Sequence, residues 1–402
     1  MKDTTAPVRL VHVTTVPQSF VFFHGQIGYL KERGFEVHMA SSPGEQAEPF
    51  RDKEGVQVHC VPMVRSITPL SDLVTLLRLW HLFRKIRPDI VHSHTPKAGL
   101  LGTLSARMAG VRVVFLSIFG LPQMVMKGLP RKLLDFTTRL ACGFAHRVWC
   151  DSFSMRDYVI QRHLCPAEKV VVFGQGSVNG VDAEHTFSPV TQNSVVRAAL
   201  RKQYRIPEAA TVLGYVGRIV GDKGMHELAE TWKVLRNRHA DLHLLMVGPF
   251  EPRAPLLPED ETVFRTDPRI HLAGQRQDVA PHLAAMDIFV MPSYREGFGI
   301  TNIEAAAMEL PVVSTRIPGC IDSVQDGVTG ILVPPRDSKA LIEVIQRYID
   351  DPDLRCRHGQ AGRARIVRDF RQQTIWDALF QEYMRLLQRV SPQSGNGGVP
   401  CL

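Results

Sequence analysis

Residues 287–304 read Asp287-Ile288-Phe289-Val290-Met291-Pro292-Ser293-Tyr294-Arg295-Glu296-Gly297-Phe298-Gly299-Ile300-Thr301-Asn302-Ile303-Glu304. The apolar run at the start predicts a buried strand that ends at Pro292, followed by a glycine-spaced loop and a helix that begins near Thr301. Free N–H groups at such a helix start suit an anion such as phosphate, and the glycines let the backbone approach it. Thr301 and Glu304 also have the spacing of a capping box, so a structural role for Glu304 stays open.

The same segment resembles the Glu-x7-Glu signature of glycosyltransferase family 4. The resemblance extends through Ala305-Ala306-Ala307-Met308-Glu309-Leu310-Pro311-Val312-Val313-Ser314, Pro318-Gly319, Asp326-Gly327-Val328-Thr329-Gly330 and Leu332-Val333-Pro334-Pro335. It covers the C-terminal half of the chain strongly and the N-terminal half more weakly. It implies a GT-B fold, in which two Rossmann-like domains face each other across a cleft.

Length and composition fit a globular enzyme of more than one domain. The chain has 402 residues, of which 44% are hydrophobic and 22% charged, and chains of this length usually divide into two cores. Seven cysteines are scattered without a C-x-x-C pair, which favours a reducing compartment over a disulfide framework or a zinc knuckle. The net charge of +8 indicates an anionic partner, either phosphate, acidic lipid or nucleic acid, but no motif supports nucleic acid.

The start of the chain has no feature of a targeting segment. Residues 1–7 are polar and lead directly into the strand-like run Arg9-Leu10-Val11-His12-Val13, so the apolar core of a signal peptide is missing. No stretch approaches the roughly 20 apolar residues that span a bilayer. We therefore expect a cytoplasmic protein.

Short β-branched runs alternate with helix-length segments along the whole chain. Strands are expected at residues 10–14, 36–40, 56–61, 89–93, 112–117, 147–151 and 169–173, then at 211–216, 243–247, 269–272, 287–291, 311–314 and 331–333. Helices are expected at 71–86, 98–109, 223–238 and 338–349. This alternation predicts parallel sheets with helices on both faces, and two series of strands predict two Rossmann-like domains.

Strand signals lapse between residues 179 and 203, where a polar helix containing Arg197 and Arg201 intervenes. We therefore expect an N-terminal, acceptor-side domain at 1–185 and a C-terminal, nucleotide-sugar-binding domain at 186–373. The family resemblance implies that a final helix at 374–390 crosses back to the first domain. The Ser-, Gly- and Pro-rich tail at 391–402 is expected to be mobile.

Two cations follow the first strand of the second domain, in the segment Gly217-Arg218-Ile219-Val220-Gly221-Asp222-Lys223-Gly224. A departing diphosphate needs cations or N–H donors where its negative charge grows. The segment resembles the family's Gly-Arg…Lys-Gly element, which implies that Arg218 and Lys223 grip the diphosphate and, with Glu296, carry catalysis. A solvated turn with surface cations is the structural alternative.

The resemblance also implies a donor-binding set around these residues. Glu296 would lie against the donor sugar, Glu304 would accept hydrogen bonds from the ribose, and Gln275 would lie beside the base. The remaining donor-binding positions are Gly25, Gly248, Gly274, Gly297, Phe298, Gly299, Ile300 and Thr301. A lone glycine such as Gly25 also has a structural interpretation, because it permits a turn.

On the acceptor side, the segment Val91-His92-Ser93-His94-Thr95-Pro96-Lys97-Ala98-Gly99 resembles a variant found in enzymes of bacterial surface polysaccharides. His92 and His94 alternate at a strand end and share one face, as two metal ligands would, but no third ligand has a telling spacing. A polar cleft wall is the favoured interpretation. Many relatives carry a histidine where this chain has Phe119, which neither transfers a proton nor accepts a hydrogen bond.

We expect no metal and no cofactor besides the nucleotide sugar. The acidic pair Asp351-Pro352-Asp353 follows a late helix and is typical of a helix-ending turn. The resemblance implies that the anomeric configuration is retained, by attack on the face that the diphosphate leaves. UDP is the commonest donor nucleotide in the family and is our expectation here.

The acceptor is expected to be a glycan linked to a lipid diphosphate such as undecaprenyl diphosphate, in capsule, exopolysaccharide or O-antigen synthesis. A basic amphipathic helix at 71–86 indicates a peripheral membrane face, although ordinary core packing explains the same pattern. Its apolar and basic residues, with further cations of the first domain, are Leu73, Leu76, Leu77, Arg78, Trp80, Phe83, Arg84, Lys85, Arg87, Lys127, Arg131, Lys132 and Arg139.

Three other functions are compatible with a two-domain cleft. A nonhydrolysing sugar-nucleotide epimerase shares the architecture, but the ordered motifs disfavour it. A nonenzymatic sugar-nucleotide binder would keep the cations and carboxylates without turnover, and Phe119 leaves that alternative open. A dehydrogenase is disfavoured because Gly174-Gln175-Gly176 does not open a helix after a strand.

Overall fold

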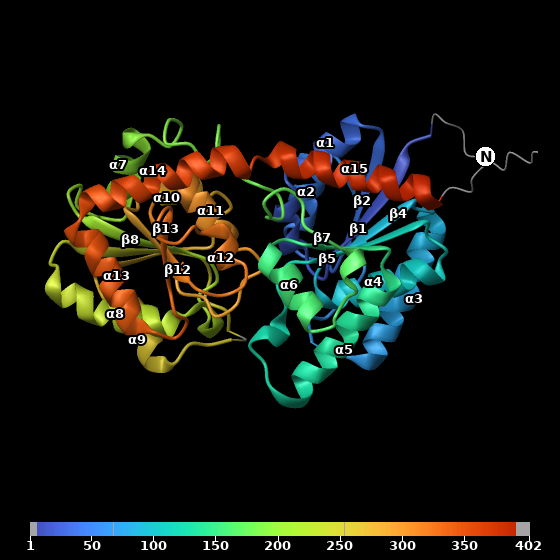
Figure 1. The fold of residues 1–402 in the computed structure, drawn as a ribbon, viewed down its shortest axis with the longest axis horizontal. Helices are drawn as coiled ribbons and strands as arrows, with labels where there is room; N and C mark the ends of the chain where they lie inside the picture. The colour runs from blue at the N-terminus through green and yellow to red at the C-terminus, as the bar shows by residue number, and fades with distance from the viewer. Residues whose placement is uncertain (1–5, 67, 253, 391–402) are drawn as a thin grey trace, which may run out of the picture.

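The computed structural model describes residues 6–390 except residues 67 and 253, and it shows two α/β lobes side by side (Figure 1). The predicted tail at 391–402 lies outside the described residues. Each lobe contains one sheet, of seven strands in the first and six in the second, and the strand pairings within both sheets are parallel. The predicted α/β class with two Rossmann-like domains is confirmed.

The first sheet has the order β3-β2-β1-β4-β5-β6-β7. Its strands are β1 (Val8–Val13), β2 (Phe35–Ser41), β3 (Gln57–Cys60), β4 (Ile90–Ser93), β5 (Val113–Ile118), β6 (Arg147–Cys150) and β7 (Val170–Val171). One face packs on α3 (Pro69–Ile86), α4 (Pro96–Met108), α5 (Gly128–Phe144) and α6 (Phe153–Gln161), and the other on α1 (Gln26–Glu32), α2 (Ala47–Glu54) and α15 (Gln372–Val390). The strands are short apolar runs because both faces of the sheet are covered.

The second sheet has the order β10-β9-β8-β11-β12-β13. Its strands are β8 (Thr211–Val216), β9 (Leu242–Val247), β10 (Ile270–Gly274), β11 (Ile288–Met291), β12 (Val312–Thr315) and β13 (Gly330–Val333). The helices α8 (Met225–Arg238), α9 (Pro258–Thr266) and α13 (Ser338–Asp350) cover one face. The other face packs on α7 (Ser194–Gln203), α10 (Ala280–Ala284), α11 (Ile300–Ala307) and α14 (Pro352–Asp369).

Every strand expected from the sequence is present, with ends that differ by a few residues, and the strand expected at 169–173 is reduced to β7. The acidic pair around Pro352 does lie at a helix boundary. Asp351 ends α13 and its side chain accepts a 2.8 Å hydrogen bond from the Leu354 N–H at the start of α14.

The chain passes between the lobes twice, and the two passages touch. Val181 N donates a 2.8 Å hydrogen bond to Phe370 O, just before α15 returns to the first lobe. There Ile375, Leu379 and Tyr383 are fully buried against the first sheet. The crossing of the final helix is therefore a feature of the structure, and Figure 1 shows α14 and α15 running along one side of both lobes.

Helix α3 is only partly the helix expected. The face that packs on the sheet carries Thr75, Leu79 and Phe83. Phe83 therefore does not belong to the membrane face to which the sequence assigned it. Leu73, Leu77 and Trp80 are exposed instead. Within the described chain, no helix combines the length and the apolar character that crossing a membrane requires.

Candidate functional site

The predicted donor residues gather at the carboxyl edge of the second sheet. The strand order reverses at β8, which lies between β9 and β11, and ligands of doubly wound sheets bind at such a switch point. The loop after β8 carries Arg218 and Lys223, and the loop after β11 carries Glu296. The two loops approach so closely that a β-carbon at Gly224 would lie 2.0 Å from Pro292 O.

Lys223 and Glu296 form an ion pair across this switch point. Lys223 Nζ lies 2.5 Å from Glu296 Oε1, and each side chain is 14% exposed. Ser293 Oγ donates a 2.7 Å hydrogen bond to the same oxygen. Oε1 is thereby held by two donors, which leaves Oε2 as the acceptor available to a ligand.

A second link between the same loops involves Arg295, which the sequence analysis did not single out. Arg295 Nη2 donates a 2.7 Å hydrogen bond to Asp222 Oδ2. Arg295 and Lys223 hold the pKa of Asp222 below its usual range, against the opposing effect of burial. The two ion pairs, Lys223–Glu296 and Asp222–Arg295, thus hold the loop after β11 against the loop after β8.

Arg218 lies in the same loop but points to another partner. Its Nη1 lies 2.9 Å from Glu251 Oε2, and its side chain is 40% exposed. Arg65 of the first lobe also approaches Glu251, at 3.9 Å. The Arg218 backbone is fixed by Tyr215, whose hydroxyl donates a 2.7 Å hydrogen bond to Arg218 O.

The predicted glycines at the ends of β9 and β10 lie beside this loop. Gly248 N donates a 2.9 Å hydrogen bond to Gly274 O, and a β-carbon at Gly248 would lie 1.8 Å from Gly217 O. Gly274 has a φ of +69° with open space where a side chain would be, and Gln275 beyond it is exposed. These residues share the edge that carries Lys223.

The start of α11 is not a capping box. The N-cap residue is Gly299 with a φ of +76°, and no side chain caps the helix. Thr301 Oγ1 instead donates to Met291 Sδ at 3.3 Å. Glu304 therefore does not hold the helix start, and burial raises the pKa of its carboxyl to about 7. The first-turn N–H groups of Ile300 and Thr301 stay available to an anion.

The loop at Gly297 touches the first lobe. A β-carbon on Gly297 would lie 2.4 Å from Asp151 Oδ2 and 2.7 Å from the carbonyl carbon of Phe119. Ser152 Oγ donates a 3.0 Å hydrogen bond to Gly297 O, and Phe298 is buried against Phe370 with ring centroids 5.5 Å apart. The Phe119 backbone thus lies beside the donor loop, and its correspondence to the histidine of relatives stays a prediction.

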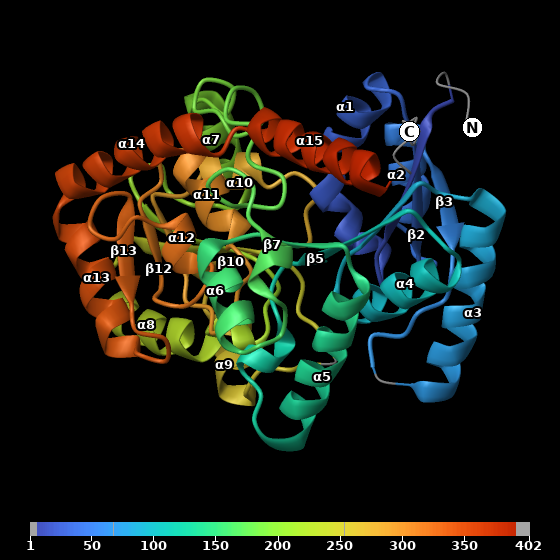
Figure 2. The same cartoon turned by 45° about the vertical axis from the view of Figure 1, so that its right-hand side comes forward.

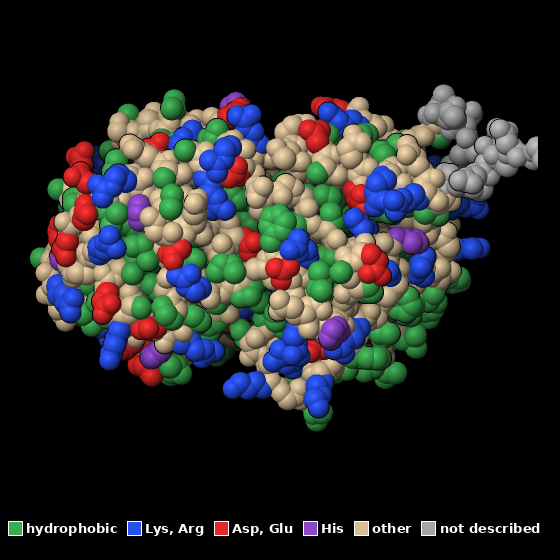
Figure 3. Space-filling view, viewed as in Figure 1, with side chains coloured by type: hydrophobic (Ala, Val, Ile, Leu, Met, Phe, Trp, Pro, Cys, Tyr) green, Lys and Arg blue, Asp and Glu red, His purple; other side chains and the backbone are tan. Residues whose placement is uncertain are grey.

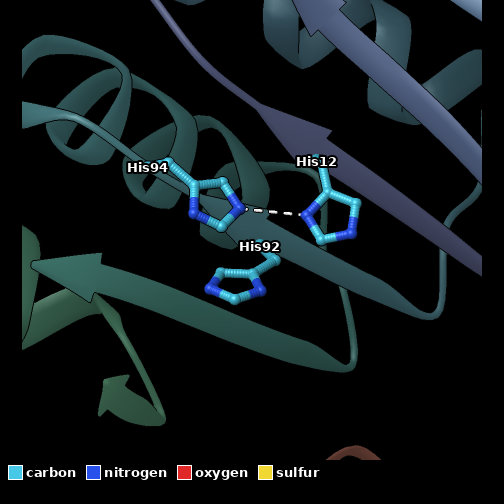
Figure 4. Close-up of side chains that lie close together, drawn as sticks. All are labelled: His12, His92 and His94. Atoms are coloured by element: carbon cyan, nitrogen blue, oxygen red, sulfur yellow. Dashed lines mark hydrogen bonds between the residues drawn. The ribbon is translucent and has the colours of Figure 1, made fainter. Parts of the chain in front are cut away.

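The two predicted acceptor-side histidines belong to a cluster of three. His12 on β1 pairs in register with His92 on β4, and these strands flank the switch point of the first sheet. His12 Nδ1 and His94 Nε2 are 2.9 Å apart. Figure 4 shows these two rings edge to edge, with His92 beneath them.

No third ligand was predicted beside His92 and His94, and the structure supplies His12, because one nitrogen from each of these three buried rings lies within 4.8 Å of the others. His92, however, already uses both ring nitrogens. Its Nδ1 is 2.5 Å from the Tyr383 hydroxyl and its Nε2 is 2.6 Å from Ser117 Oγ. A metal would have to displace one of these bonds, so the set fits a hydrogen-bonded cluster better than a metal centre.

Burial keeps this cluster neutral. It lowers the pKa of His12 to about 3 and lowers the pKa values of His92 and His94 well below the usual range. The expectation that the protein needs no metal stays a prediction.

Gly25 follows the loop after β1, but its surroundings are structural. A β-carbon there would lie 2.7 Å from the ring of Trp376 on α15, and its φ is +77°. The need for glycine at this position is explained by that contact, and its role toward the donor stays a prediction.

Neither His12 nor Arg295 was predicted to be a site residue, and the reasons differ. His12 is one residue of a strand, about 80 positions from its partners, and no spacing rule links such positions. Arg295 directly precedes Glu296, so its position was a signal, but a surface cation was an equally good interpretation.

Comparisons with known proteins place the chain among glycosyltransferases. Two family models match, "Glycosyl transferase 4-like domain" at residues 21–176 and "Glycosyl transferases group 1" at residues 210–351. The "Capsular polysaccharide biosynthesis glycosyltransferase CapM" of Staphylococcus aureus is 34% identical, over 94% of this chain and 98% of the relative. An Escherichia coli "UDP-Gal:alpha-D-GlcNAc-diphosphoundecaprenol alpha-1,3-galactosyltransferase" is 27% identical, over 88% of this chain and 91% of the relative.

Among solved structures, Anabaena Alr3699/HepE in complex with UDP and glucose superposes with a TM-score of 0.76 at 18% identity. The superposition covers 94% of this chain and 99% of that one. At this identity the likeness concerns the fold, and the GT-B arrangement of the two lobes is confirmed.

Proposed function

The chain belongs to glycosyltransferase family 4, and from this premise we propose that it transfers a sugar from a UDP-linked donor to a lipid-linked glycan acceptor in bacterial surface-polysaccharide synthesis. The observation that carries the donor half of the proposal is the Lys223–Glu296 pair at the switch point of the second sheet. The acceptor half is supported by the names of the capsular and the diphosphoundecaprenol relatives.

In the proposed reaction the bond between the anomeric carbon and a diphosphate oxygen breaks, and the leaving UDP gains negative charge. Lys223, Arg218 and the N–H groups at the start of α11 stabilise that charge, since donors fixed before the reaction need no reorganisation during it. Arg218 exchanges its bond with Glu251 for one with the diphosphate. Glu296 Oε2 accepts a hydrogen bond from the sugar, which orients its anomeric carbon.

An acceptor hydroxyl attacks on the face that the diphosphate leaves, so the anomeric configuration is retained. The new C–O bond forms as the old one breaks, and the departing diphosphate oxygen takes the hydroxyl proton. This route needs no histidine at the position of Phe119.

The proposed membrane-binding face lies on the first lobe. The N-terminal turns of α3 and α5 expose large apolar side chains, among them Leu70 and Leu129, which are 84% and 78% exposed. Exposed Lys127, which directly precedes α5, and exposed Lys132 on α5 accompany them. Figure 3 shows hydrophobic side chains along the lower right edge, over α3, and Lys and Arg side chains beside them over α5. We propose that this α3–α5 face (Leu70, Leu73, Leu77, Trp80, Leu129, Leu133, Phe136 and Leu140) rests on an anionic bilayer that carries the lipid-linked acceptor.

Slow hydrolysis of UDP-sugars without an acceptor tests the donor half. We expect the protein to release UDP from one member of a panel of UDP-hexoses and UDP-N-acetylhexosamines, and Lys223→Ala or Glu296→Ala to lower that rate by about 100- to 1000-fold. Lys233→Ala is the matched control, because Lys233 forms an ion pair with Glu230 on the surface of α8.

The products separate the alternatives. UDP binding by calorimetry without UDP release would identify a sugar-nucleotide binder, and an epimerised UDP-sugar without release would identify an epimerase. Wild-type rates in both alanine variants would contradict the proposed site.

A further inference from the structure

A small cavity of about 180 Å³ lies at the carboxyl edge of the first sheet. Its wall is mostly apolar and includes the aromatic rings of Phe22, Phe23 and Phe119. His94 of the first lobe and Arg295 of the second lobe also line it, so both lobes contribute to its wall. It lies beside Phe119, whose backbone touches the donor loop.

Two residues that line this cavity each carry a buried nitrogen atom with no hydrogen-bond partner among the described residues. His94 is 2% exposed, its Nε2 is bonded to His12, and its Nδ1 has none. Arg295 uses Nη2 toward Asp222, and its Nε has none. An unsatisfied buried polar atom costs about 1–3 kcal/mol, so two of them in one small cavity indicate that a ligand supplies their partners.

We propose that this cavity holds the terminal sugar ring of the acceptor, bound by His94 Nδ1 and Arg295 Nε, with Phe119 packed against the ring. The proposal rests on the glycosyltransferase function and names the residues that bind the acceptor. Arg295 follows the strand that leads to Glu296, so one loop contacts the donor and the acceptor together. Phe119 then has a positive role, as an apolar wall for the sugar face.

The electrostatics of the cavity favour hydroxyl groups over phosphate. The charge of Arg295 is already matched by Asp222 at 2.7 Å, and burial keeps His94 neutral by lowering its pKa. A neutral imidazole that shares one proton with His12 presents Nδ1 either as a donor or as an acceptor, and a hydroxyl group is both. A phosphate dianion only accepts hydrogen bonds and gains most from charged donors, so it fits this pair of nitrogens less well.

His12 acts as a positioning residue in this arrangement. The 2.9 Å contact between His12 Nδ1 and His94 Nε2 occupies the other nitrogen of His94 and fixes the plane of its ring, as Figure 4 shows. The ring of Phe23 lies against both histidines, with centroids 4.8 Å from His12 and 4.9 Å from His94. The orientation of Nδ1 is therefore set by the fold before a ligand arrives.

Two amide substitutions test the roles of the two ring nitrogens of His94 separately. His94→Gln places an amide near Nε2, which keeps the contact with His12 and removes the atom that faces the sugar, whereas His94→Asn keeps a polar atom near Nδ1 and loses the contact with His12. Arg295→Lys keeps a cation beside Asp222 and removes Nε. Melting temperatures confirm that each variant is folded.

Initial rates are measured with the UDP-sugar that wild-type protein hydrolyses and with diphosphoundecaprenol carrying one N-acetylglucosamine or one N-acetylgalactosamine. We expect His94→Gln and Arg295→Lys to raise the KM for the acceptor about tenfold or more, and His94→Asn to raise it less, as the loss of one hydrogen bond to a buried group implies. The KM for the UDP-sugar should keep its wild-type value in the two His94 variants, and Arg295→Lys, in the loop that carries Glu296, should change it less than it changes the KM for the acceptor.

Three results would overturn the inference while leaving the donor site intact. They are an unchanged acceptor KM in both His94→Gln and Arg295→Lys, UDP-sugar hydrolysis without transfer to either acceptor, and one equivalent of zinc bound by wild-type protein and lost in His94→Gln. Failure of the glycosyltransferase function itself would look different, since wild-type protein would then release no UDP at all.

Discussion

At the scale of single residues, the two carboxylates of the Glu-x7-Glu signature lie in opposite environments. Glu296 is neutralised by Lys223 at 2.5 Å. Glu304 forms no ion pair within the described part of the chain, and burial raises the pKa of its carboxyl from 4.5 to about 7. The family resemblance implied that Glu296 reaches the sugar and Glu304 the ribose, but it gave no indication that only Glu296 is paired.

The raised pKa of Glu304 makes the stability of the apo protein depend on pH. The folded chain holds this proton more tightly than the unfolded chain, so the stabilisation is fully present below pH 4.5 and is lost as the pH rises to about 7. Above pH 7 a partly buried charge remains, and because solvent screens part of it, Glu304→Gln should raise the free energy of unfolding at pH 8 by about 2 kcal/mol. Urea unfolding at pH 4 and pH 8 measures this difference.

A control substitution and a binding assay sharpen this test. Glu343→Gln changes an exposed glutamate on α13 and should leave the pH dependence of stability as in wild type. If the ionised carboxylate accepts the ribose hydroxyls, Glu304→Gln also weakens UDP binding at pH 8. Equal unfolding profiles of Glu304→Gln and wild type across pH 4–8 would show that Glu304 has an ordinary pKa.

At the scale of elements, the seam between the lobes is made by a helix of one lobe and a carboxylate of the other. Asp322 on α12 (Cys320–Ser323) accepts hydrogen bonds from the Phe153 and Ser154 N–H groups at the start of α6, at 3.1 and 3.3 Å, and from the Ser154 hydroxyl. Gly319 N donates a 2.7 Å hydrogen bond to Ser154 Oγ in return. A helix start in the first lobe is thus capped from the second lobe.

Removing this cap should loosen the seam. Loss of a capping side chain costs about 1 kcal/mol, so Asp322→Ala should speed hydrogen exchange of the Phe153 and Ser154 amides about fivefold and increase the radius of gyration in solution. Asp337→Ala is the matched control, because Asp337 caps α13 within its own lobe, at 2.9 Å from Ala340 N. Equal exchange at α6 in the two variants would argue against a cap that joins the lobes.

Elements of this protein were easier to predict than the contacts between them. The strands were recognisable because each is a short apolar run buried on both faces, and the loops after β8 and β11 follow from parallel topology. The Asp322 cap and the His12–His94 contact join positions far apart in the sequence, and neither follows a local pattern. The start of α11 was predicted within one residue, but its N-cap was not, because Gly299 takes a positive φ that replaces a side-chain cap.

At the scale of the whole molecule, α15 ties the acceptor cluster to the C-terminal part of the chain. Tyr383 on this helix is fully buried, and its hydroxyl is 2.5 Å from His92 Nδ1. Trp376 packs on Gly25, and its Nε1 donates a 2.7 Å hydrogen bond to Asn179 Oδ1 in the passage between the lobes. The first lobe is therefore completed by residues that follow the second, so the division at residues 185 and 373, which stays a prediction, does not separate two independent folding units.

The α3–α5 face combines side chains of two helices that are separated by α4 along the chain. Figure 2 shows the N-terminal ends of α3 and α5 at the same lower edge of the first lobe. We expect wild-type protein to float with vesicles that contain phosphatidylglycerol at low salt, and to float less as salt screens the cations. Leu70→Glu and Leu129→Glu should each weaken binding about tenfold, because each removes an apolar side chain from the interface and adds a repelled charge.

The second lobe supplies the control for that experiment. Val190 and Val195 are 82% and 73% exposed, so Val190→Glu and Val195→Glu add the same charge to equally exposed apolar positions outside the proposed face. These variants should float as wild type does if the bilayer contacts the first lobe alone. Equal losses in all four variants would mean that net charge, and not the α3–α5 face, sets binding. Absence of wild-type protein from the vesicle fraction at low salt would mean that the lipid-linked acceptor reaches the His94 and Arg295 cavity without a docked membrane surface.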